Sequence, residues 1–433
     1  MKKDIQGIGL GMASRFAGSE WAEKWGLRHP VEKLAYRSTK LGFKLVGQLQ
    51  QKQSQKKATD NTPPKPAALL FDVSLTEEQQ MIADSLRVFA GDELRPAAHD
   101  ADEQLHIPDT LLRSSMDMGL NEFAVPESYG GSASQLSPLN SVIIAEQLGW
   151  GDFSLAYALL APVAVANAIA RWGSEAQKQA LLPAYLTGEP MRSAIAIQEP
   201  QPLFSSQSLR TEAKRTRKGF VLNGEKSLVP FAGHADYYLI AAQYNKSMRL
   251  FIVPHNSKGV SWQDEPAMGL RAVGTGRLTL NNVSLPANAL LGEQETPFDS
   301  AVFFALGQLH SGAIAVGTAQ AALDYLIPYC NERVAFGEPI SHRQSVAFIL
   351  ANIAIELESM RLMIWRAAAL AEHGQPFQRE AYLAHVLCAE KAMEIGTQAV
   401  QLLGGHGFTK EHPAERWYRD LRALASLHSG LHA

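Results

Sequence analysis

The sequence predicts an α+β fold in which a helical domain, an antiparallel β-domain and a helical bundle follow one another along the chain. Apolar residues recur at helical spacing up to about Gly188 and again after Pro297, with the loop VPESYGGSAS inside the first region. Between these regions, residues 190–290 contain short alternating or β-branched runs separated by Gly, Asn and Pro, as in GFVLNG, YYLIAAQY, RLFIVP and GRLTLNNVSLP. Because helices and strands are segregated, we expect separate helical and β layers.

Length and composition indicate a soluble globular protein of several domains. The chain has 433 residues, of which 46% are hydrophobic and 19% are charged, and this length exceeds the usual size of a single core. We expect an extension over residues 1–66, a helical domain over 67–188, a β-domain over 189–297 and a helical bundle over 298–433.

The extension carries much of the basic charge. It holds 13 Lys or Arg and 5 Asp or Glu, so the net charge of −3 leaves −11 for the rest of the chain. Residues 51–66 are polar and end in prolines, as linkers do. Residues 33–50 predict a basic amphipathic helix, with cations at Lys33, Arg37, Lys40 and Lys44. Such a helix packs on the protein's own body or a partner, or it lies peripherally on an anionic membrane surface.

The first helical domain opens on a predicted cap. Ser74 or Thr76 can accept a hydrogen bond from the first helical turn, and Glu77 and Glu78 in that turn favour the helix dipole. Two later stretches, Phe153–Ala170 and Ser300–Leu323, are apolar enough for membrane spans, but both contain polar residues or glycines. We therefore expect buried core helices. Because the first residues lack an apolar run, no cleavable signal peptide is predicted.

The two cysteines, Cys330 and Cys388, lie far apart in the sequence. This spacing predicts neither a disulfide framework nor a thiolate metal site, and it favours a reducing, cytoplasmic location.

Four motifs, in this order, resemble the acyl-CoA dehydrogenase family over residues 69–433. They begin at LTEEQQMIADSLRVFAGDELRPAA, continue with GLRAVGTGRLTLNNVSLPANALLG and ERVAFGEPISHRQ, and end with QLLGGHGFTKEHPAERWYRD. The resemblance implies noncovalent FAD at a subunit interface, a homotetramer or homodimer, and α,β-dehydrogenation of an acyl-CoA thioester in fatty acid metabolism. It also implies an electron-transfer flavoprotein or a similar acceptor. We expect no nucleic-acid partner and no metal.

In the family, the C-terminal motifs reach the pyrophosphate and adenine half of the FAD that a neighbouring subunit holds. The matching residues here are Arg333, Phe336, Gln344, Gln401, Gly404 and Gly405. A guanidinium can pair with phosphate, an aromatic ring can stack on adenine, and glycines let backbone N–H groups approach an anion. Alternatively, the glycines end a helix and Arg333 is a solvated charge.

The β-domain departs from the family's flavin cradle. The segment IQEPQPLFSSQ keeps Glu199 and Pro200 after Gln198, but Gln201 and Leu203 replace glycines. Beside the expected flavin ring, Leu228 and Pro230 replace an aromatic residue and a hydroxyl residue. The resemblance nevertheless implies that Gln198, Glu199, Leu228 and Pro230 bind the cofactor.

The catalytic base is the largest departure from the family. The usual glutamate position falls on His428 or Ser429, and the position used by a minority of members falls on Gly307. None of these is a carboxylate. His428 and His310 are weak candidates for an imidazole base, and Phe304 and Gln308 are candidates for substrate contact.

Three functions follow from this pattern. The chain is an acyl-CoA dehydrogenase with an atypical or missing base, or it is a non-catalytic subunit that donates FAD contacts to a catalytic acyl-CoA dehydrogenase subunit. A flavin monooxygenase of the same fold, which needs no carboxylate base, ranks third.

Overall fold

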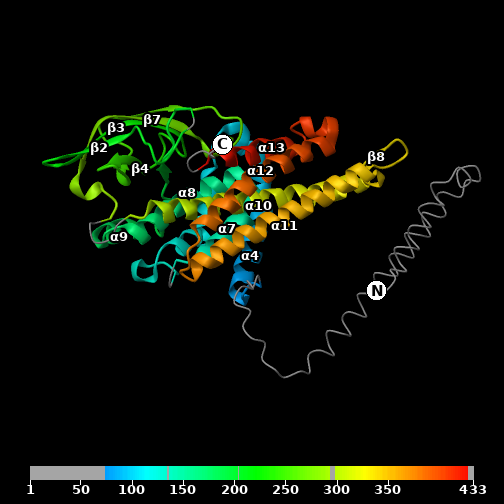
Figure 1. Ribbon diagram of the computed structural model, residues 1–433, viewed down its shortest axis with the longest axis horizontal. Helices are drawn as coiled ribbons and strands as arrows, with labels where there is room; N and C mark the ends of the chain where they lie inside the picture. The colour runs from blue at the N-terminus through cyan, green and yellow to red at the C-terminus, as the bar shows by residue number, and fades with distance from the viewer. Residues whose placement is uncertain (1–73, 134–135, 203, 293–297, 428–433) are drawn as a thin grey trace, which may run out of the picture. The chain divides into compact units, whose positions relative to one another are not determined.

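The structure is a computed structural model that describes residues 74–133, 136–202, 204–292 and 298–427 (Figure 1). The predicted extension with its basic helix at 33–50 lies outside the described residues, as do His428 and Ser429.

The first part of the described chain is helical, as predicted. The helix α4 begins after Thr76 rather than Ser74, because the Thr76 side chain accepts from Gln79 N while the Gln79 side chain accepts from Thr76 N. The helices of this part are α4 (Glu77–Phe89), the π-helical turn η1 (Ala90–Leu94), α5 (Arg95–Gln104), α6 (Asp109–Asp117), α7 (Pro138–Gly151), α8 (Phe153–Trp172) and α9 (Glu175–Leu181), with 3₁₀ turns η2 (Leu120–Ala124), η3 (Glu127–Tyr129) and η4 (Leu182–Tyr185).

The middle part forms one twisted sheet with the order β1-β4-β2-β3-β7-β6, to which β5 adds beside β4. Its strands are β1 (Ser193–Ala196), β2 (Glu212–Thr216), β3 (Gly219–Val229), β4 (Tyr237–Tyr244), β5 (Ser247–Pro254), β6 (Val260–Asp264) and β7 (Gly276–Pro286), with 3₁₀ turns η5 (Arg271–Val273) and η6 (Ala287–Ala289). The predicted β-domain is confirmed, and most of its strand pairs are antiparallel, but the sheet is mixed because β4 pairs in parallel with β1 and, over one residue pair, with β2. The long β1–β4 connection, which contains the β2–β3 hairpin, makes the parallel pairing possible.

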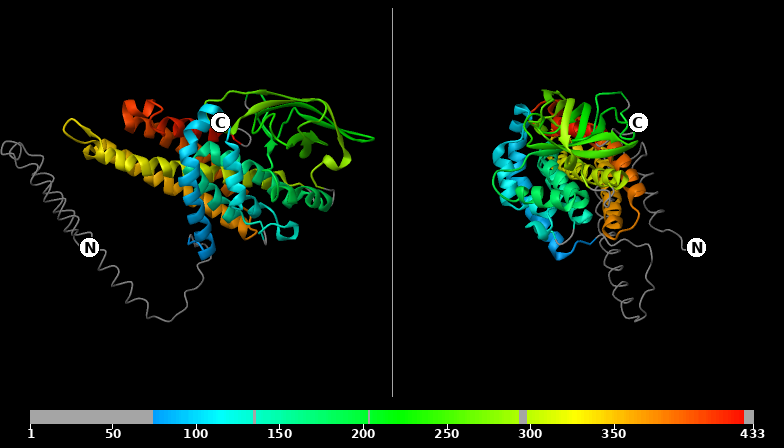
Figure 2. Two further views of the ribbon diagram at one scale, coloured as in Figure 1. Left: turned by 180° about the vertical axis from the view of Figure 1, so that it is seen from behind. Right: turned by 90° about the vertical axis from the view of Figure 1, so that its left-hand side faces the viewer.

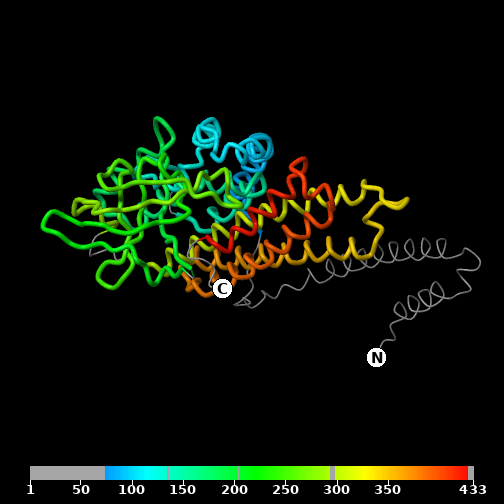
Figure 3. The backbone as a smooth tube through the Cα atoms, turned by 90° about the horizontal axis from the view of Figure 1, so that it is seen from above, coloured from blue at the N-terminus to red at the C-terminus, as the bar shows by residue number. Residues whose placement is uncertain are grey.

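The last part is a bundle of long helices that extends away from the sheet (Figure 3). Its helices are α10 (Ser300–Glu332), α11 (Gln344–Glu372), α12 (Gln378–Leu403) and α13 (Ala414–Ala423), with 3₁₀ turns η7 (Ile340–His342), η8 (Gly404–Phe408) and η9 (Leu424–Ser426). A hairpin of β8 (Val334–Ala335) and β9 (Glu338–Pro339) joins α10 to α11, and the sequence did not predict it.

The helices α8 and α10 are long and apolar enough to cross a membrane, but most of each lies inside the described part of the protein. Figure 2 shows the N-terminal helices crossing the bundle helices. Two glycines set the closest approach: a Cβ on Gly317 would lie 1.9 Å from Glu146 O, and one on Gly149 would lie 2.3 Å from Ile314 O. At this crossing, Thr318 Oγ1 donates to Gly149 O at 2.7 Å. The backbones of α7 and α10 therefore meet directly.

A buried acid in α13 joins the three parts of the chain. Asp420, which is 1% exposed, accepts a hydrogen bond from Leu270 N of the β-domain at 2.7 Å and one from Ser154 Oγ of α8 at 2.9 Å. Next to it, Arg419 donates to both carboxylate oxygens of Asp102 in α5 at 2.9 Å and to Met268 O at 3.1 Å. We call Asp420, Arg419 and the backbone of residues 268–270 the domain junction.

The cations near this junction pair with other acids. Arg416 donates to Asp152 at 2.9 Å and Arg419 to Asp102, so Asp420 itself carries no direct guanidinium bond among the described residues. Burial, with the nearby Asp152 charge, raises the pKa of Asp420 to about 7. The junction therefore holds a carboxyl group that stays protonated well above its usual range.

We predict that Asp420→Ala lowers the free energy of unfolding by about 3 kcal/mol, because it leaves two buried donors without an acceptor. Asp420→Asn keeps one acceptor oxygen and should cost about 1 kcal/mol at pH 5. In the unfolded chain this carboxyl loses its proton near pH 4, but in the folded protein only near pH 7. Wild type should therefore lose stability relative to Asp420→Asn as the pH rises from 5 to 8.

Denaturant unfolding at both pH values measures this difference, with the exposed Asp117→Asn as the control. If the difference in unfolding free energy between wild type and Asp420→Asn does not change with pH, the raised pKa of Asp420 is wrong.

Candidate functional site

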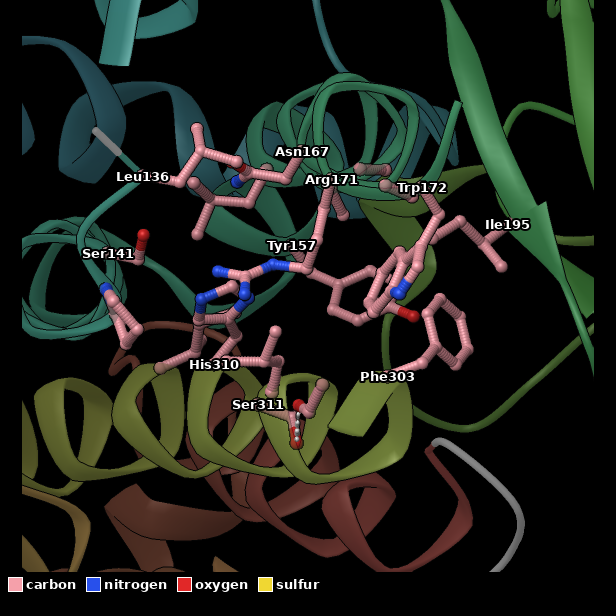
Figure 4. A pocket seen from close by; sticks show the side chains of 18 of the residues that line it. Leu136, Ser141, Tyr157, Asn167, Arg171, Trp172, Ile195, Phe303, His310 and Ser311 are labelled. Carbon is pink, nitrogen blue, oxygen red and sulfur yellow. Dashed lines mark hydrogen bonds between the residues drawn. The ribbon is translucent and has the colours of Figure 1, made fainter. Parts of the chain in front are cut away.

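A cavity of about 100 Å³ lies where α7, α8 and α10 meet (Figure 4). Ile195 of β1 and Pro230, which follows β3, also line it, so the β-domain borders the cavity. Most of the wall is apolar, contributed by Leu160, Ala161, Ala164, Phe303 and Leu306 among others. An apolar enclosure of this kind suits a hydrocarbon chain. We call it the acyl cavity, after the chain that the resemblance leads us to expect in it.

The acyl cavity has two different ends. Figure 4 shows Tyr157, Trp172, Ile195 and Phe303 grouped on one side, and the Arg171 guanidinium close to the His310 ring on the other. Asn167 and Ser141 also line the cavity, and Figure 4 draws them on the same side as the Arg171 guanidinium and His310. The cavity therefore combines an aromatic end near the β-domain with a polar end between the helices.

No motif in the sequence pointed to the α8 residues that form this wall. They are Tyr157, Asn167, Arg171 and Trp172, and together with Leu160, Ala161 and Ala164 they follow the spacing of one helix face. An amide and a guanidinium four residues apart in an otherwise apolar helix are a recognisable signal, because a core face rarely carries either group.

A second cavity, of about 230 Å³, lies between the β-domain and α13. Residues 267–270, Leu228 and Thr275 form one side, and Arg419, Arg422 and Leu427 form the other. Tyr157 lines both this cavity and the acyl cavity. Burial raises the pKa of Tyr157 to about 12, so the phenol is neutral, and its hydroxyl has no hydrogen-bond partner within the described chain.

Neither cavity is lined by an aspartate or glutamate of the described residues. In the acyl cavity the titratable groups are Tyr157, Arg171 and His310. Burial, together with the charge of Arg171, lowers the pKa of His310 to about 4. His310 is therefore neutral at physiological pH, and the same surroundings oppose its taking up a proton.

The structure describes one of the three positions expected for the catalytic base, Gly307. Gly307 lines the acyl cavity, so a side chain at this position would point into it. His428 and Ser429 lie outside the described residues, but Leu427, directly before them, lines the second cavity. Phe303 and Leu306 line the acyl cavity, whereas Phe304 and Gln308, the residues expected to contact substrate, do not. The helical phase explains this, because 303, 307, 310 and 314 share one face of α10.

The β-domain residues expected to bind cofactor separate into two groups. Leu228 lines the second cavity and Pro230 the acyl cavity. Glu199 is instead buried, and its carboxylate accepts from Arg210 N, Thr211 N and the buried Lys226 at distances of 2.7–2.9 Å. Burial opposes ionisation, but these partners hold the pKa of Glu199 below its usual value. Its carboxylate therefore anchors the loop that follows Gln198.

The loop after Glu199 accommodates its bulky residues by burying one of them. Phe204 is buried in an apolar cluster with Ile197 and Leu209, and Leu203 is outside the described residues. At the far end of β3 the backbone is strained: Leu228 has φ 52° and Phe231 has φ 53°. Glu265 accepts from Leu228 N at 2.7 Å and thereby uses the donor that this residue offers.

The residues expected to reach a neighbour's FAD all lie at the surface. Arg333, Phe336, Gln344, Gln401, Gly404 and Gly405 are exposed. Tyr329, one turn before Arg333, donates to Leu403 O at 3.4 Å and contacts His406 Nδ1 at 2.8 Å, so the α10 end and the GGHG turn lie together. Gly404 is also the C-cap of α12, as the alternative interpretation expected.

Phe336 is almost fully exposed to solvent. Its side chain is 94% exposed and its φ is 54°, an unusual conformation for a residue with a side chain. The Arg343 guanidinium lies 5.3 Å from its ring. A strained turn that presents an aromatic ring to solvent indicates a binding surface.

The second cavity and the bundle end have the chemistry that FAD requires. Leu228, Leu270 and Leu427 offer apolar surface for a flat ring, and Arg422 Nε is buried in the described chain without a hydrogen-bond partner. No side or main chain lies within 4 Å of a Cβ placed on Gly404 or Gly405, so backbone there is open to a ligand. The residues present therefore fit the cofactor.

Comparison with known proteins agrees with this arrangement. Three family models match the chain in order, namely the acyl-CoA dehydrogenase N-terminal domain over residues 76–189, the middle domain over 194–283 and the C-terminal domain over 301–428. The short-chain specific acyl-CoA dehydrogenase of Homo sapiens mitochondria is 33% identical over 366 residues, which is 83% of this chain and 88% of that protein. The probable acyl-CoA dehydrogenase YngJ of Bacillus subtilis is 32% identical over 364 residues, covering 82% and 95%.

A solved structure is similar over the same region. Butyryl-CoA dehydrogenase from Megasphaera elsdenii superposes with a TM-score of 0.77 at 29% identity, covering 83% of this chain and 97% of that one. Because the three family models match in order and cover most of the chain, and because the relatives agree, the chain belongs to the acyl-CoA dehydrogenase family.

Proposed function

We propose that the chain is an FAD-dependent oxidoreductase that removes hydrogen from Cα and Cβ of an acyl-CoA thioester. The observation that supports this most directly is the pair of cavities that share Tyr157. One cavity suits an acyl chain, and the other has apolar and arginine walls suited to a flavin ring. An acyl group and a flavin bound in them would approach each other near Tyr157.

The reaction needs a hydride acceptor and a base. FAD, when bound, would accept the hydride that leaves Cβ. The α-proton is only weakly acidic, so a positioned group must take it. Because no described carboxylate lines either cavity, we propose an atypical or missing base, with His310 and His428 as the candidates.

His310 could act as this base only if a negative charge near Arg171 stabilised its protonated form. It is neutral and faces the acyl cavity, but burial and Arg171 oppose the imidazolium that proton transfer would create. A negative charge beside Arg171 would reduce this opposition.

We also propose an assembly in which a neighbouring subunit completes the cofactor site. Support comes from the exposed bundle end, where Arg333, Phe336, Gly404 and Gly405 have open surface around them. A homo-oligomer would place these residues on its own FAD, and an electron-transfer flavoprotein or similar acceptor would reoxidise it. A cytoplasmic location, and membrane contact through residues 33–50, are proposals from sequence alone.

The second candidate is a non-catalytic subunit that donates FAD contacts to a catalytic acyl-CoA dehydrogenase subunit. It is favoured by a contrast within the chain: the outward-facing residues at the bundle end are exposed, whereas Glu265 already accepts from the Leu228 N–H beside the chain's own cavity. A flavin monooxygenase is the third candidate, and its support is the lack of a carboxylate in the described walls.

We predict that the full-length chain purified alone is yellow and that an acyl-CoA bleaches its flavin absorption without oxygen. The measurement is a visible spectrum before and after addition of the thioester. A colourless protein that binds no added FAD, and becomes yellow only when co-expressed with a catalytic partner, would favour the second candidate.

We further predict that Gly307→Glu raises dehydrogenation by about 100-fold or more, because a carboxylate at this position points into the acyl cavity. Gly307→Gln is the matched control, since it has the same size and no base. Single-turnover flavin reduction measures the effect. Equal rates in the two variants, both loaded with FAD and thioester, would rule out position 307 as a site for the base.

A further inference from the structure

Arg171 lies in the wall of the acyl cavity without an acidic partner in the described part of the chain. The Trp172 ring lies 5.8 Å from its guanidinium carbon, and its charge lowers the pKa of His310. Burial also lowers the pKa of Arg171 itself. A charged group is thus partly removed from water, and no acid among the described residues neutralises it.

Three other poorly exposed arginines of the described chain pair with acids, whereas Arg422, whose Nε is buried without a hydrogen-bond partner, lines the second cavity. Arg361 donates to Glu146 at 2.7 Å, Arg416 to Asp152 at 2.9 Å and Arg419 to Asp102 at 2.9 Å. Arg95, which has no carboxylate, stacks on Trp150 and donates to Trp150 O at 3.2 Å. Because a buried cation without partners is costly, the contrast indicates that the partner of Arg171 is a ligand.

The groups around Arg171 point to an anion. Asn167 lies one turn earlier on α8, and His310 approaches from α10, and neither has a hydrogen-bond partner among the residues described. Figure 4 shows the guanidinium beside the His310 ring and away from Ile195. An amide, a guanidinium and an imidazole can together donate to both oxygens of a carboxylate.

We propose that the acyl group of the substrate ends in a carboxylate, which Arg171 binds at the polar end of the acyl cavity. The proposal rests on the proposed function, because it assumes that an acyl-CoA thioester enters with its thioester end toward the β-domain. A methyl-terminated chain would instead cover the guanidinium with hydrocarbon and leave its charge unpaired. Arg171 would then determine specificity and not take part in the chemical steps.

The position of Arg171 in its helix does not by itself explain this arrangement. It lies in the last turn of α8, where a cation interacts favourably with the helix dipole. A side chain on the solvent side of the same turn would gain that interaction and stay hydrated. The helix dipole therefore does not explain why the Arg171 side chain points into the cavity.

The test is a calorimetric titration of the full-length chain with three thioesters of similar length: glutaryl-CoA, its terminal amide, and hexanoyl-CoA. Wild type should bind glutaryl-CoA about tenfold or more tightly than either neutral thioester, as expected for a charge-assisted contact. In Arg171→Gln this ratio should fall to about one, because glutaryl-CoA loses its charged partner and hexanoyl-CoA no longer covers an unpaired charge. Arg113→Gln, which removes a surface arginine paired with Glu189, should keep the wild-type ratio.

Arg171→Lys provides a variant that keeps the charge. It should retain part of the preference, because an ammonium attracts a carboxylate without the forked geometry of a guanidinium. Circular dichroism of each variant checks its folding.

The outcomes separate the two proposals. Equal binding of all three thioesters by wild type, or a preference that survives in Arg171→Gln, overturns the carboxylate proposal and leaves the acyl-CoA function intact. Equal binding of glutaryl-CoA and its amide overturns it in favour of a neutral polar end. If wild type binds none of the thioesters, the proposed function fails, and the carboxylate proposal fails with it.

Discussion

The hydrogen bond from Leu270 N to Asp420 is the contact on which the arrangement of the site depends. Asp420 belongs to α13, Leu270 to the β-domain, and the third partner, Ser154, to α8. Arg419 reinforces this contact by binding Asp102 and Met268 O. The same residues, 268–270, are one wall of the second cavity. A shift of this junction would therefore move that wall relative to Tyr157 and the acyl cavity.

The buried acids of this region are used in contacts between the domains. Asp102, Asp152 and Asp420 are buried and hold the domains together through Arg416, Arg419 and backbone donors. The cavities beside them are lined by cations and neutral groups instead. The negative charges are thus in the contacts between domains, and the positive charges are in the cavity walls. Carboxylates stabilise the joints between domains, and the described cavity walls have none to offer for proton transfer.

The sequence predicted the segregated fold and the position of several strands well. YYLIAAQY and GRLTLNNVSLP coincide with β4 and β7 because alternation and flanking turn residues are local signals. It could not predict the parallel β1–β4 pair or the walls of the acyl cavity, since both depend on contacts between distant segments. Position 307 was recognised by resemblance, but the place of Arg171 required knowing which face of α8 meets α10.

Two features of the acyl cavity are related: the described wall has no carboxylate, and Arg171 has no acidic partner among the described residues. A glutamate introduced at position 307 would lie one turn from His310, where the positive charge of Arg171 also acts. That positive charge would lower the pKa of the new carboxyl and make it a weaker base in the absence of substrate. A substrate carboxylate bound to Arg171 would cancel much of this field and restore the basicity of a nearby carboxylate or imidazole. The charge of the substrate would then decide both whether it binds and how well any base in this cavity can act.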